Sequence, residues 1–211
     1  MKNNIELLKE KLRFYNLEIF ESKLVELVSH FRKFKHYNKI LVCGNGGSAS
    51  DSLHFVGEMM KNFTMERSVD ENFRKNYQKL YGEDDILKHT HGTIRALSLT
   101  SEISLITAIA NDIGYDYIFS QQVYGYGDEG DILFAFSTSG DSKSVINACK
   151  MAQAKKILVV GFTGKTGGKM KDYCNILINV DATNTMVIQQ NHEILFHIIA
   201  QVLEMERFLN C

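Results

Sequence analysis

Residues 40–60 hold the feature that most restricts how this chain can fold: an apolar run, a glycine-rich loop and a helical pattern in immediate succession. Residues 40–43 are typical of a buried strand. Residues 44–48 follow as a loop almost without side chains, and Ser48 or Ser50 is the expected cap of the next helix. Bare backbone and unpaired N–H groups at a helix N-terminus bind phosphate readily, so the stretch predicts an anion site.

The predicted helix carries His54 and Glu58, which are four residues apart and therefore lie on one face. Such a pair can hold a metal ion or perform acid–base chemistry beside the glycine loop. In isolation, a histidine and a glutamate at this spacing are more often a solvated or packed pair. Their position next to a predicted anion site favours the functional interpretation.

A second polar loop repeats this arrangement after the apolar run 132–136. Between that run and a helical pattern at 144–153 lie Ser137, Thr138, Ser139, Gly140 and Ser142. Capping of the helix by Ser139 or Ser142 requires one hydroxyl, whereas four are present. Hydroxyl groups together with helix N–H groups suit a phosphate monoester, so we expect anion binding here too.

Strands and helices alternate along the rest of the chain, with further strands predicted at 94–100, 157–162 and 176–180. This alternation indicates an α/β fold in which helices cover both faces of a parallel sheet. Ligands of such sheets bind at the carboxyl ends of the strands, where both polar loops lie. We expect N-terminal helices at 1–38 that pack on the sheet or on a partner subunit, followed by one domain at 39–211.

The segment 64–92 is an insertion in that domain, because it is polar and too long for an ordinary connection. A short helix is expected at 72–80. His89 and His91 stand near its end without a third ligand at matching spacing, so we expect exposed loop histidines and no metal site.

Composition excludes several classes of protein. The 211 residues carry a formal charge of −1, so a dedicated nucleic-acid-binding protein is not expected. No apolar run reaches membrane length and the N-terminus has an amphipathic pattern, so we expect a cytoplasmic protein with no membrane partner. Cys43, Cys149, Cys174 and Cys211 have no paired spacing, so a zinc cluster is not expected, and three of them lie in apolar surroundings typical of buried thiols.

Two nucleotide-binding motifs match only in part. Gly44, Gly46 and Ala49 satisfy the dinucleotide fingerprint, but the next strand is predicted only at 94–100 and has no acidic residue at its end. The stretch GFTGKTGGK resembles a P-loop, but Val159 occupies the position of the required first glycine. We therefore reject both interpretations.

A long amphipathic helix, expected at 184–209, carries Gln189, His192 and His197. Gln189 and His197 are eight residues apart and so about 80° apart around the helix, close enough to reach one site. His192 lies on the other flank of Gln189. The residues alone do not select between the two histidines.

Several motifs together resemble the sugar isomerase (SIS) domain and, more narrowly, the phosphoheptose isomerase family. They are CGNGGS followed by His54 and Glu58, AND-x-G, STSGxS, TGKxGGK, and IQxxH in the last helix. The resemblance extends in order from Lys39 to Glu206. It implies a flavodoxin-like three-layer αβα sandwich with a five-stranded parallel sheet, assembled as a homotetramer with sites at subunit interfaces.

The resemblance also implies the residues of a sugar-phosphate site. The phosphate would be held by Ser137, Thr138, Ser139 and Ser142. The rest of the substrate would contact Asn45, Gly46, Gly47, Ser48, Glu58, Asn111, Asp112 and Gln189. One zinc ion per subunit would be held by His54, Glu58, Gln189 and His197, a donor set that suits zinc without excluding other divalent metals.

The implied activity is the isomerisation of sedoheptulose 7-phosphate to D-glycero-D-manno-heptose 7-phosphate through an enediol, the first step of bacterial heptose synthesis for lipopolysaccharide or capsule. By the family pattern, Glu58 is the base and His197 the acid, although the sequence does not fix which group has which role. The alternative is a non-catalytic SIS regulator or replication-initiator adaptor. Those proteins lack the His/Glu/Gln/His set, which this chain retains.

The chain also departs from the family pattern. The segment 64–92 is longer than in the shortest members. Val187 stands where an arginine is common, and Gln190 and Asn191 replace the usual glutamate and apolar residue. These changes leave the expected metal ligands intact and bear on which sugar fits.

Overall fold

The computed structural model describes residues 4–209, and its centre is a parallel sheet of five strands. The strands occur in the spatial order β2-β1-β3-β4-β5, which is the flavodoxin-like order. Their bounds are β1 Ile40–Cys43, β2 Ala96–Ser98, β3 Ile132–Phe136, β4 Leu158–Thr163 and β5 Ile176–Asn179. The predicted α/β sandwich and its five-stranded parallel sheet are confirmed.

Alternate residues of the central strands point into two separate apolar cores, as expected for a sheet covered on both faces. Ile40 and Val42 of β1 lie in one core, and Leu41 and Cys43 lie in the other. The strand is therefore a continuous apolar run and not an alternating one.

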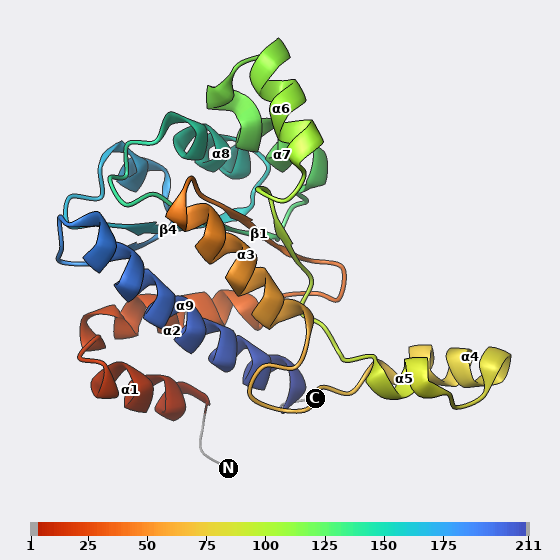
Figure 1. The fold of residues 1–211 in the computed structure, drawn as a ribbon. Helices are drawn as coiled ribbons and strands as arrows, with labels where there is room; N and C mark the ends of the chain where they lie inside the picture. Colours follow the sequence, from red (N-terminus) through yellow and green to blue (C-terminus); the bar gives the residue numbers. More distant parts are fainter. Residues whose placement is uncertain (1–3, 210–211) are drawn as a thin grey trace.

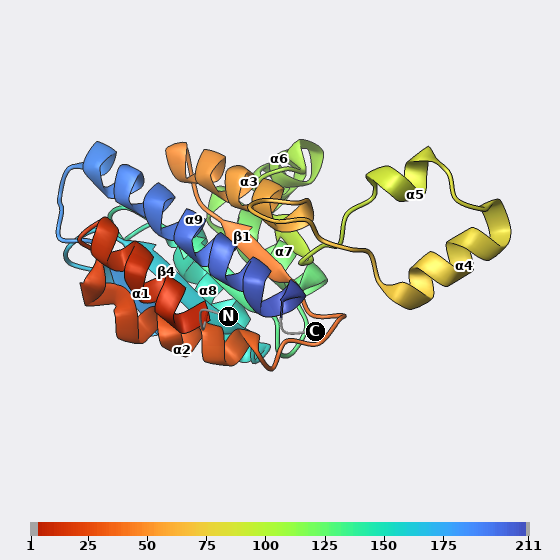
Figure 2. The same cartoon turned by 90° about the horizontal axis from the view of Figure 1, so that it is seen from below.

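Helices α3 (Gly47–Met60) and α9 (Thr185–Phe208) cover the first face and lie side by side (Figures 1 and 2). The N-terminal helices α1 (Asn4–Phe14) and α2 (Glu21–Phe31), with the 3-10 helix η1 (Glu18–Phe20), pack against α9 and β5 of the same chain. Their apolar stripes enter the same core as α3 and α9. The leading helices thus pack on the chain's own sheet and last helix.

The second face is covered by α6 (Ile103–Asp112), α7 (Ile118–Tyr126) and α8 (Lys143–Ala154). Two 3-10 helices, η2 (Tyr115–Tyr117) and η3 (Lys169–Tyr173), complete this layer. All strands run in the same direction, so the loops after β1 and β3 meet at one edge of the sheet.

Two local predictions are wrong. Strand β2 is shorter than the expected 94–100. Helix α3 begins before both expected caps, because Gly46 adopts φ 58° and turns the chain directly into the helix. No side chain caps this helix end, and Ser48 lies in its first turn.

The insertion folds into a projection that we call the arm, residues 68–92, which stands away from the sandwich (Figures 1 and 2). It contains α4 (Glu71–Tyr81), as predicted, and the short helix α5 (Asp85–His89). Asp70 caps α4 and Asp84 caps α5. Of the helices in the described residues, none is long and apolar enough to cross a bilayer.

Candidate active site

The glycine loop after β1 ends at a helix whose first N–H groups have no side-chain cap. Gly46 and Gly47 are exposed there, and Ser48 is buried. A Cβ atom on Gly47 would collide with the side-chain amide of Gln189 from α9. The loop is thus open to an anion and closely packed against the last helix.

Asn45 joins this loop to the second polar loop. Its Nδ2 donates to Oγ of Ser142 at 2.8 Å and to Oγ of Ser144 at 3.0 Å. Its Oδ1 accepts a hydrogen bond of 2.8 Å from the hydroxyl of Tyr115. Both amide protons of Asn45 are therefore used within the protein. A ligand could therefore contact Asn45 only through its backbone or through the remaining lone pair of Oδ1.

The second polar loop also ends at a helix without a side-chain cap, because Ser142 precedes α8 but makes no capping hydrogen bond. Oγ of Ser137 accepts from N–H of Gly140, and Oγ of Ser139 accepts from N–H of Asp141. Gly140 has φ 71°, and a Cβ there would collide with the backbone of Gly167. The GKTGGK stretch, residues 164–169, therefore packs directly against the second polar loop.

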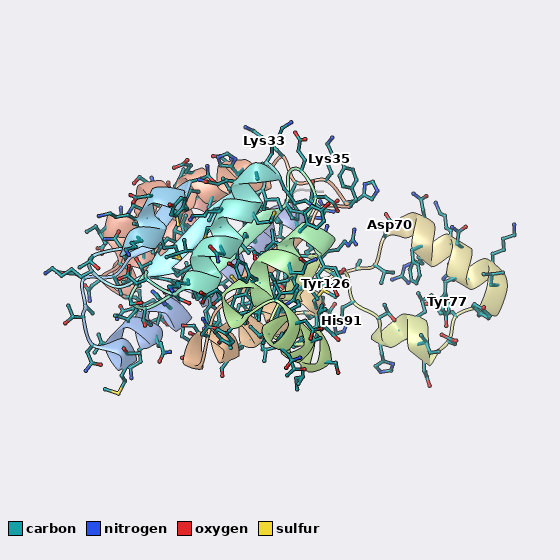
Figure 3. All side chains as sticks on the ribbon, turned by 90° about the horizontal axis from the view of Figure 1, so that it is seen from above. Lys33, Lys35, Asp70, Tyr77, His91 and Tyr126 are labelled. Atoms are coloured by element: carbon teal, nitrogen blue, oxygen red, sulfur yellow. The ribbon has the colours of Figure 1, made fainter. Side chains whose placement is uncertain are left out.

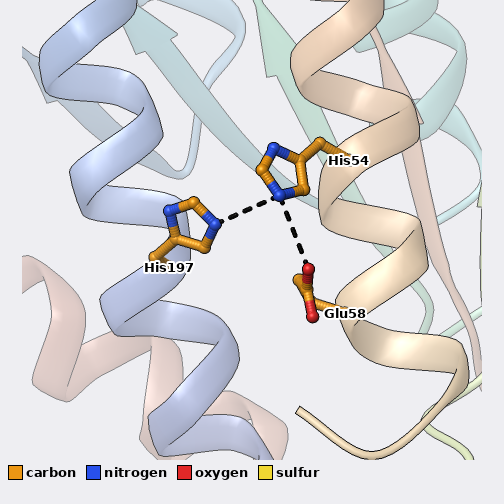
Figure 4. A group of neighbouring side chains, drawn as sticks. All are labelled: His54, Glu58 and His197. Carbon is orange, nitrogen blue, oxygen red and sulfur yellow. Dashed lines mark hydrogen bonds and ion pairs between the residues drawn. The ribbon is translucent and has the colours of Figure 1, made fainter.

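His54, Glu58 and His197 form what we call the His–Glu–His group, drawn from α3 and α9 (Figure 4). Nε2 of His54 lies 3.4 Å from Oε1 of Glu58 and 3.3 Å from Nε2 of His197. One ligand atom from each residue lies within 4.8 Å of the other two. The His54 side chain is 44% exposed and that of Glu58 is 13% exposed, so the group is open on one side.

The charges around the His–Glu–His group favour the protonation state that binds a cation. Burial and the neighbouring His54 lower the pKa of His197, against the opposing effect of Glu193 and Glu58. A neutral imidazole is the form that binds a metal. Nδ1 of His54 lies 3.7 Å from Oε1 of Glu193, which orients the ring with Nε2 toward the other two residues.

Asp51 lies one turn before His54 on α3. Burial, followed by the nearby Glu193 carboxylate, raises the pKa of Asp51 to about 6, although His54 opposes the shift. Its Oδ2 is buried without a hydrogen-bond partner among the described residues. Asp51 is therefore a nearby carboxyl group whose charged form a positive charge beside His54 would stabilise.

The structure distinguishes the two histidines that the sequence left equal. His192 is buried, its Nε2 lies 3.2 Å from the carbonyl oxygen of Thr163, and its ring packs against Phe136 and Phe162. Burial lowers the pKa of His192 to about 4. His192 is a core residue, and His197 faces His54.

The other expected residues lie at the same edge of the sheet or along the same helices. Gln189 contacts Gly47, about two helical turns from His197. Its role as a metal ligand remains a prediction. Asn111 and Asp112 are exposed in the last turn of α6, where Nδ2 of Asn111 donates to Asp112. They precede Tyr115, which reaches the glycine loop.

Sequence reasoning missed Tyr115 and Ser144. Ser144 occupies the first turn of α8 directly after the polar loop, a position that could have drawn attention to its hydroxyl. Tyr115 gave no such signal, because an exposed tyrosine after a glycine is common at the surface of any protein.

The insertion histidines differ from expectation in part. His89 is exposed but ends α5, and half-buried His91 accepts a 3.3 Å hydrogen bond at Nδ1 from N–H of Asn62. Cys43 and Cys149 are buried thiols as predicted, and Cys174 is half-buried. Cys211 lies outside the described residues.

Comparison with known proteins points to the same family as the motifs and the fold. Residues 85–164 match the family model of the SIS domain. The phosphoheptose isomerase of Burkholderia pseudomallei (strain K96243) is 37% identical over 166 residues, which cover 79% of this chain and 72% of that protein. The chain belongs to the phosphoheptose isomerase family. A relative of the same name from Aneurinibacillus thermoaerophilus is also 37% identical, over 84% of this chain and 77% of that protein.

The fold supports the same family. The solved structure of the phosphoheptose isomerase of Neisseria gonorrhoeae superposes with a TM-score of 0.71 at 31% identity. The superposition covers 95% of this chain and 92% of that one. The N-terminal helices and the sheet therefore both belong to the phosphoheptose isomerase architecture.

Proposed function

We propose that this chain is an isomerase that converts sedoheptulose 7-phosphate to D-glycero-D-manno-heptose 7-phosphate through an enediol, in heptose synthesis for lipopolysaccharide or capsule. The observation that carries the proposal is the His–Glu–His group on the two helices that flank the glycine loop. Family membership supports it, because the relatives bear the name of this activity.

The two uncapped helix ends account for substrate binding. N–H groups at the start of α8 and the hydroxyls of Ser137, Thr138, Ser139 and Ser142 would hold the phosphate. The exposed loop at Gly46 and Gly47 lies at the same edge of the sheet, so it would receive the sugar. The phosphate would thereby fix the carbonyl end of the sugar near α3.

Isomerisation requires one group to move a proton between neighbouring carbons and another to move a proton between their oxygens. Glu58 is suited to the first task, because a carboxylate can take a proton from carbon and this side chain is only 13% exposed beside His54. His197 is suited to the second, because its lowered pKa keeps the ring neutral and able both to give and to accept a proton. This assignment of roles is part of the proposal.

The His–Glu–His group fits a zinc ion, with Gln189 as the proposed fourth ligand. When bound, such an ion supplies polarisation of the carbonyl and hydroxyl oxygens of the sugar. We further propose a homotetramer in the cytoplasm, where phosphorylated sugars are retained by their charge.

The direct test is incubation of the metal-replete protein with sedoheptulose 7-phosphate, followed by NMR detection of the aldose. We expect conversion, and loss of conversion after chelation that zinc then reverses. Tight binding of the sugar phosphate without any conversion by the metal-replete protein would contradict the isomerase proposal.

Zinc binding is itself a measurable prediction. We expect His54→Ala to weaken zinc binding at least tenfold in titration calorimetry, because it removes the central imidazole of the group. His30→Ala is the matched control, since that exposed histidine lies on α2 away from the site. Equal zinc affinity in the parent and the His54 variant would show that the ion binds elsewhere.

Tyr115 provides a prediction about substrate affinity. Tyr115→Phe removes only the hydroxyl that orients Asn45, so we expect KM for the sugar phosphate to rise about threefold to tenfold with little change in kcat. Tyr117→Phe, two residues away at a similarly exposed tyrosine, is the control and should leave KM unchanged. A fall in kcat with constant KM would contradict a role in positioning the loops.

A further inference from the structure

The ring of Phe63 covers one face of the His197 ring. Their centroids lie 5.8 Å apart and their planes are inclined by 23°, which is the geometry of offset stacking. The His54 ring meets the same imidazole edge-on, at 4.7 Å and 79°. His197 is therefore in contact with one expected metal ligand and with one apolar ring that can bind neither a metal ion nor a proton.

Phe63 is fixed to the same helix that carries His197. Its N–H donates to Oε1 of Glu204 at 2.9 Å, and N–H and Oγ1 of Thr64 donate to Oε2 of the same carboxylate. Nε of Arg67 lies 2.6 Å from Oε1 of Glu204, and both of these side chains are fully buried. Glu204 follows His197 by seven residues and so lies on the same side of α9. The backbone of Phe63 is thus held in place by the helix that presents the imidazole.

These contacts lie before the arm and do not involve its helices. Figure 3 shows the arm standing clear of the sandwich, with Asp70 and His91 near its two ends and Tyr77 between its helices. The hydroxyl of Tyr77 bonds to Asp84 within the arm itself. The turn at 61–67 is therefore anchored on α9 by its own residues.

A hollow beside His197 gives the imidazole ring a second place to go. It has a volume of about 270 Å³, and His197 and Phe63 both form part of its lining. Lys11 and Tyr15 line it from the end of α1, and Gln201 lines it from α9. A long side chain in a helix has two common orientations about its first bond. Without the ring of Phe63, the imidazole would have room to turn away from α3 and into this hollow.

We propose that Phe63 is a positioning residue of the active site, whose ring keeps Nε2 of His197 turned toward His54 and away from the hollow. Phe63 acts through His197 and contacts no reacting atom. A ligand that is already oriented loses less conformational freedom when it binds, so this contact should strengthen metal binding. The inference rests on the zinc site proposed above and not on the identity of the sugar.

Zinc affinity in titration calorimetry is the first test. We expect Phe63→Ala to weaken zinc binding about tenfold or more, the scale of losing a group that orients a metal ligand. With sedoheptulose 7-phosphate, kcat should fall by a similar factor, whereas KM should stay within about twofold because the proposed phosphate contacts are unchanged. Phe63→Tyr keeps the ring and should bind zinc within about twofold of the parent protein.

Phe34→Ala is the matched control. Phe34 is also half-buried, packs against the same core and stacks on another ring, that of Phe31, at 5.0 Å. It precedes β1 and so lies at the opposite end of that strand from the glycine loop. Its loss should lower the melting temperature about as much as Phe63→Ala does and leave zinc affinity unchanged. Zinc affinity equal to that of the parent in Phe63→Ala would overturn the proposal. An equal loss of affinity in Phe34→Ala or in Phe63→Tyr would overturn it as well.

A crystal structure of Phe63→Ala, prepared without metal, gives a readout that needs neither zinc nor turnover. We expect the ring of His197 to lie in the hollow, and a ring that still faces His54 would overturn the proposal. Failure of the isomerase proposal would look different. The parent protein would then convert no sugar, while the orientation of His197 would still differ between the parent and Phe63→Ala.

Discussion

Replacement of Glu58 by glutamine should reduce kcat for sedoheptulose 7-phosphate about 1,000-fold, the scale of a lost general base. The substitution keeps the size of a side chain that is only 13% exposed and removes the charge that faces His54. A neutral amide cannot accept a proton from carbon, and it is a weaker ligand for a metal ion. Product formation by NMR, with the variant loaded with zinc, measures the effect.

Glu66→Gln is the control for this experiment. Glu66 is exposed beside the base of the arm, and the same change there should leave kcat within twofold of the parent value. Substantial turnover by zinc-loaded Glu58→Gln would contradict the assignment of Glu58 as the base. Equal melting temperatures in the two variants would exclude unfolding as the cause of lost activity.

Arg67→Ala should produce the largest loss of stability. Breaking a buried ion pair costs about 3–5 kcal/mol, because the remaining charge stays buried without a partner. Here the remaining charge is Glu204, and the change also removes donors to the carbonyls of Glu58 and Met59 at the end of α3. For a chain of this size the melting temperature should fall on the order of 10 °C.

Arg32→Ala gives the matched comparison. Arg32 also forms a two-pronged ion pair with a glutamate of α9, Glu206, but its side chain is 49% exposed. The side chain of Glu206 is 4% exposed, so this pair is buried at one end only. Water at the Arg32 end weakens the pair, so the melting temperature should fall by less than in Arg67→Ala. Equal losses in the two variants would show that burial of the Arg67 pair has no special effect.

The same pair predicts a dependence on pH. Burial alone would raise the pKa of Glu204, but hydrogen bonds from Thr64, Phe63 and Arg67 together lower the pKa below its usual value. A carboxylate with a lowered folded pKa stabilises the protein above its unfolded pKa, which is about 4.3. That contribution should disappear as the pH falls through the lower folded value, and urea titrations at several pH values would measure it.

Sequence reasoning recovered the elements whose apolar pattern is strong. Strands β1 and β3 and the last helix lie where they were expected, because buried parallel strands are continuous apolar runs. The cap of α3 was misplaced, because the left-handed backbone of Gly46 allows the helix to begin without a polar side chain. A glycine pattern does not reveal which of its members takes that conformation.

The candidate site could be anticipated from local sequence patterns at the two polar loops and at the pair His54 and Glu58, which the structure brings to α3 and the sheet edge. It was not predictable where tertiary packing decides. His192 and His197 lie on one helix, and only the tertiary structure shows that His192 is buried in the core against Phe136. The bond from Tyr115 to Asn45 joins residues 70 positions apart, which no local pattern indicates.

Arg67 has a consequence for how the protein can move. Its guanidinium donates to the carbonyl of Glu58, the residue whose carboxylate faces His54, and to Glu204 of α9. Arg67, the residue directly before the arm, therefore ties the end of α3 to α9. A displacement of the chain at Arg67 would be passed to both helices, and so to the residue that faces His54.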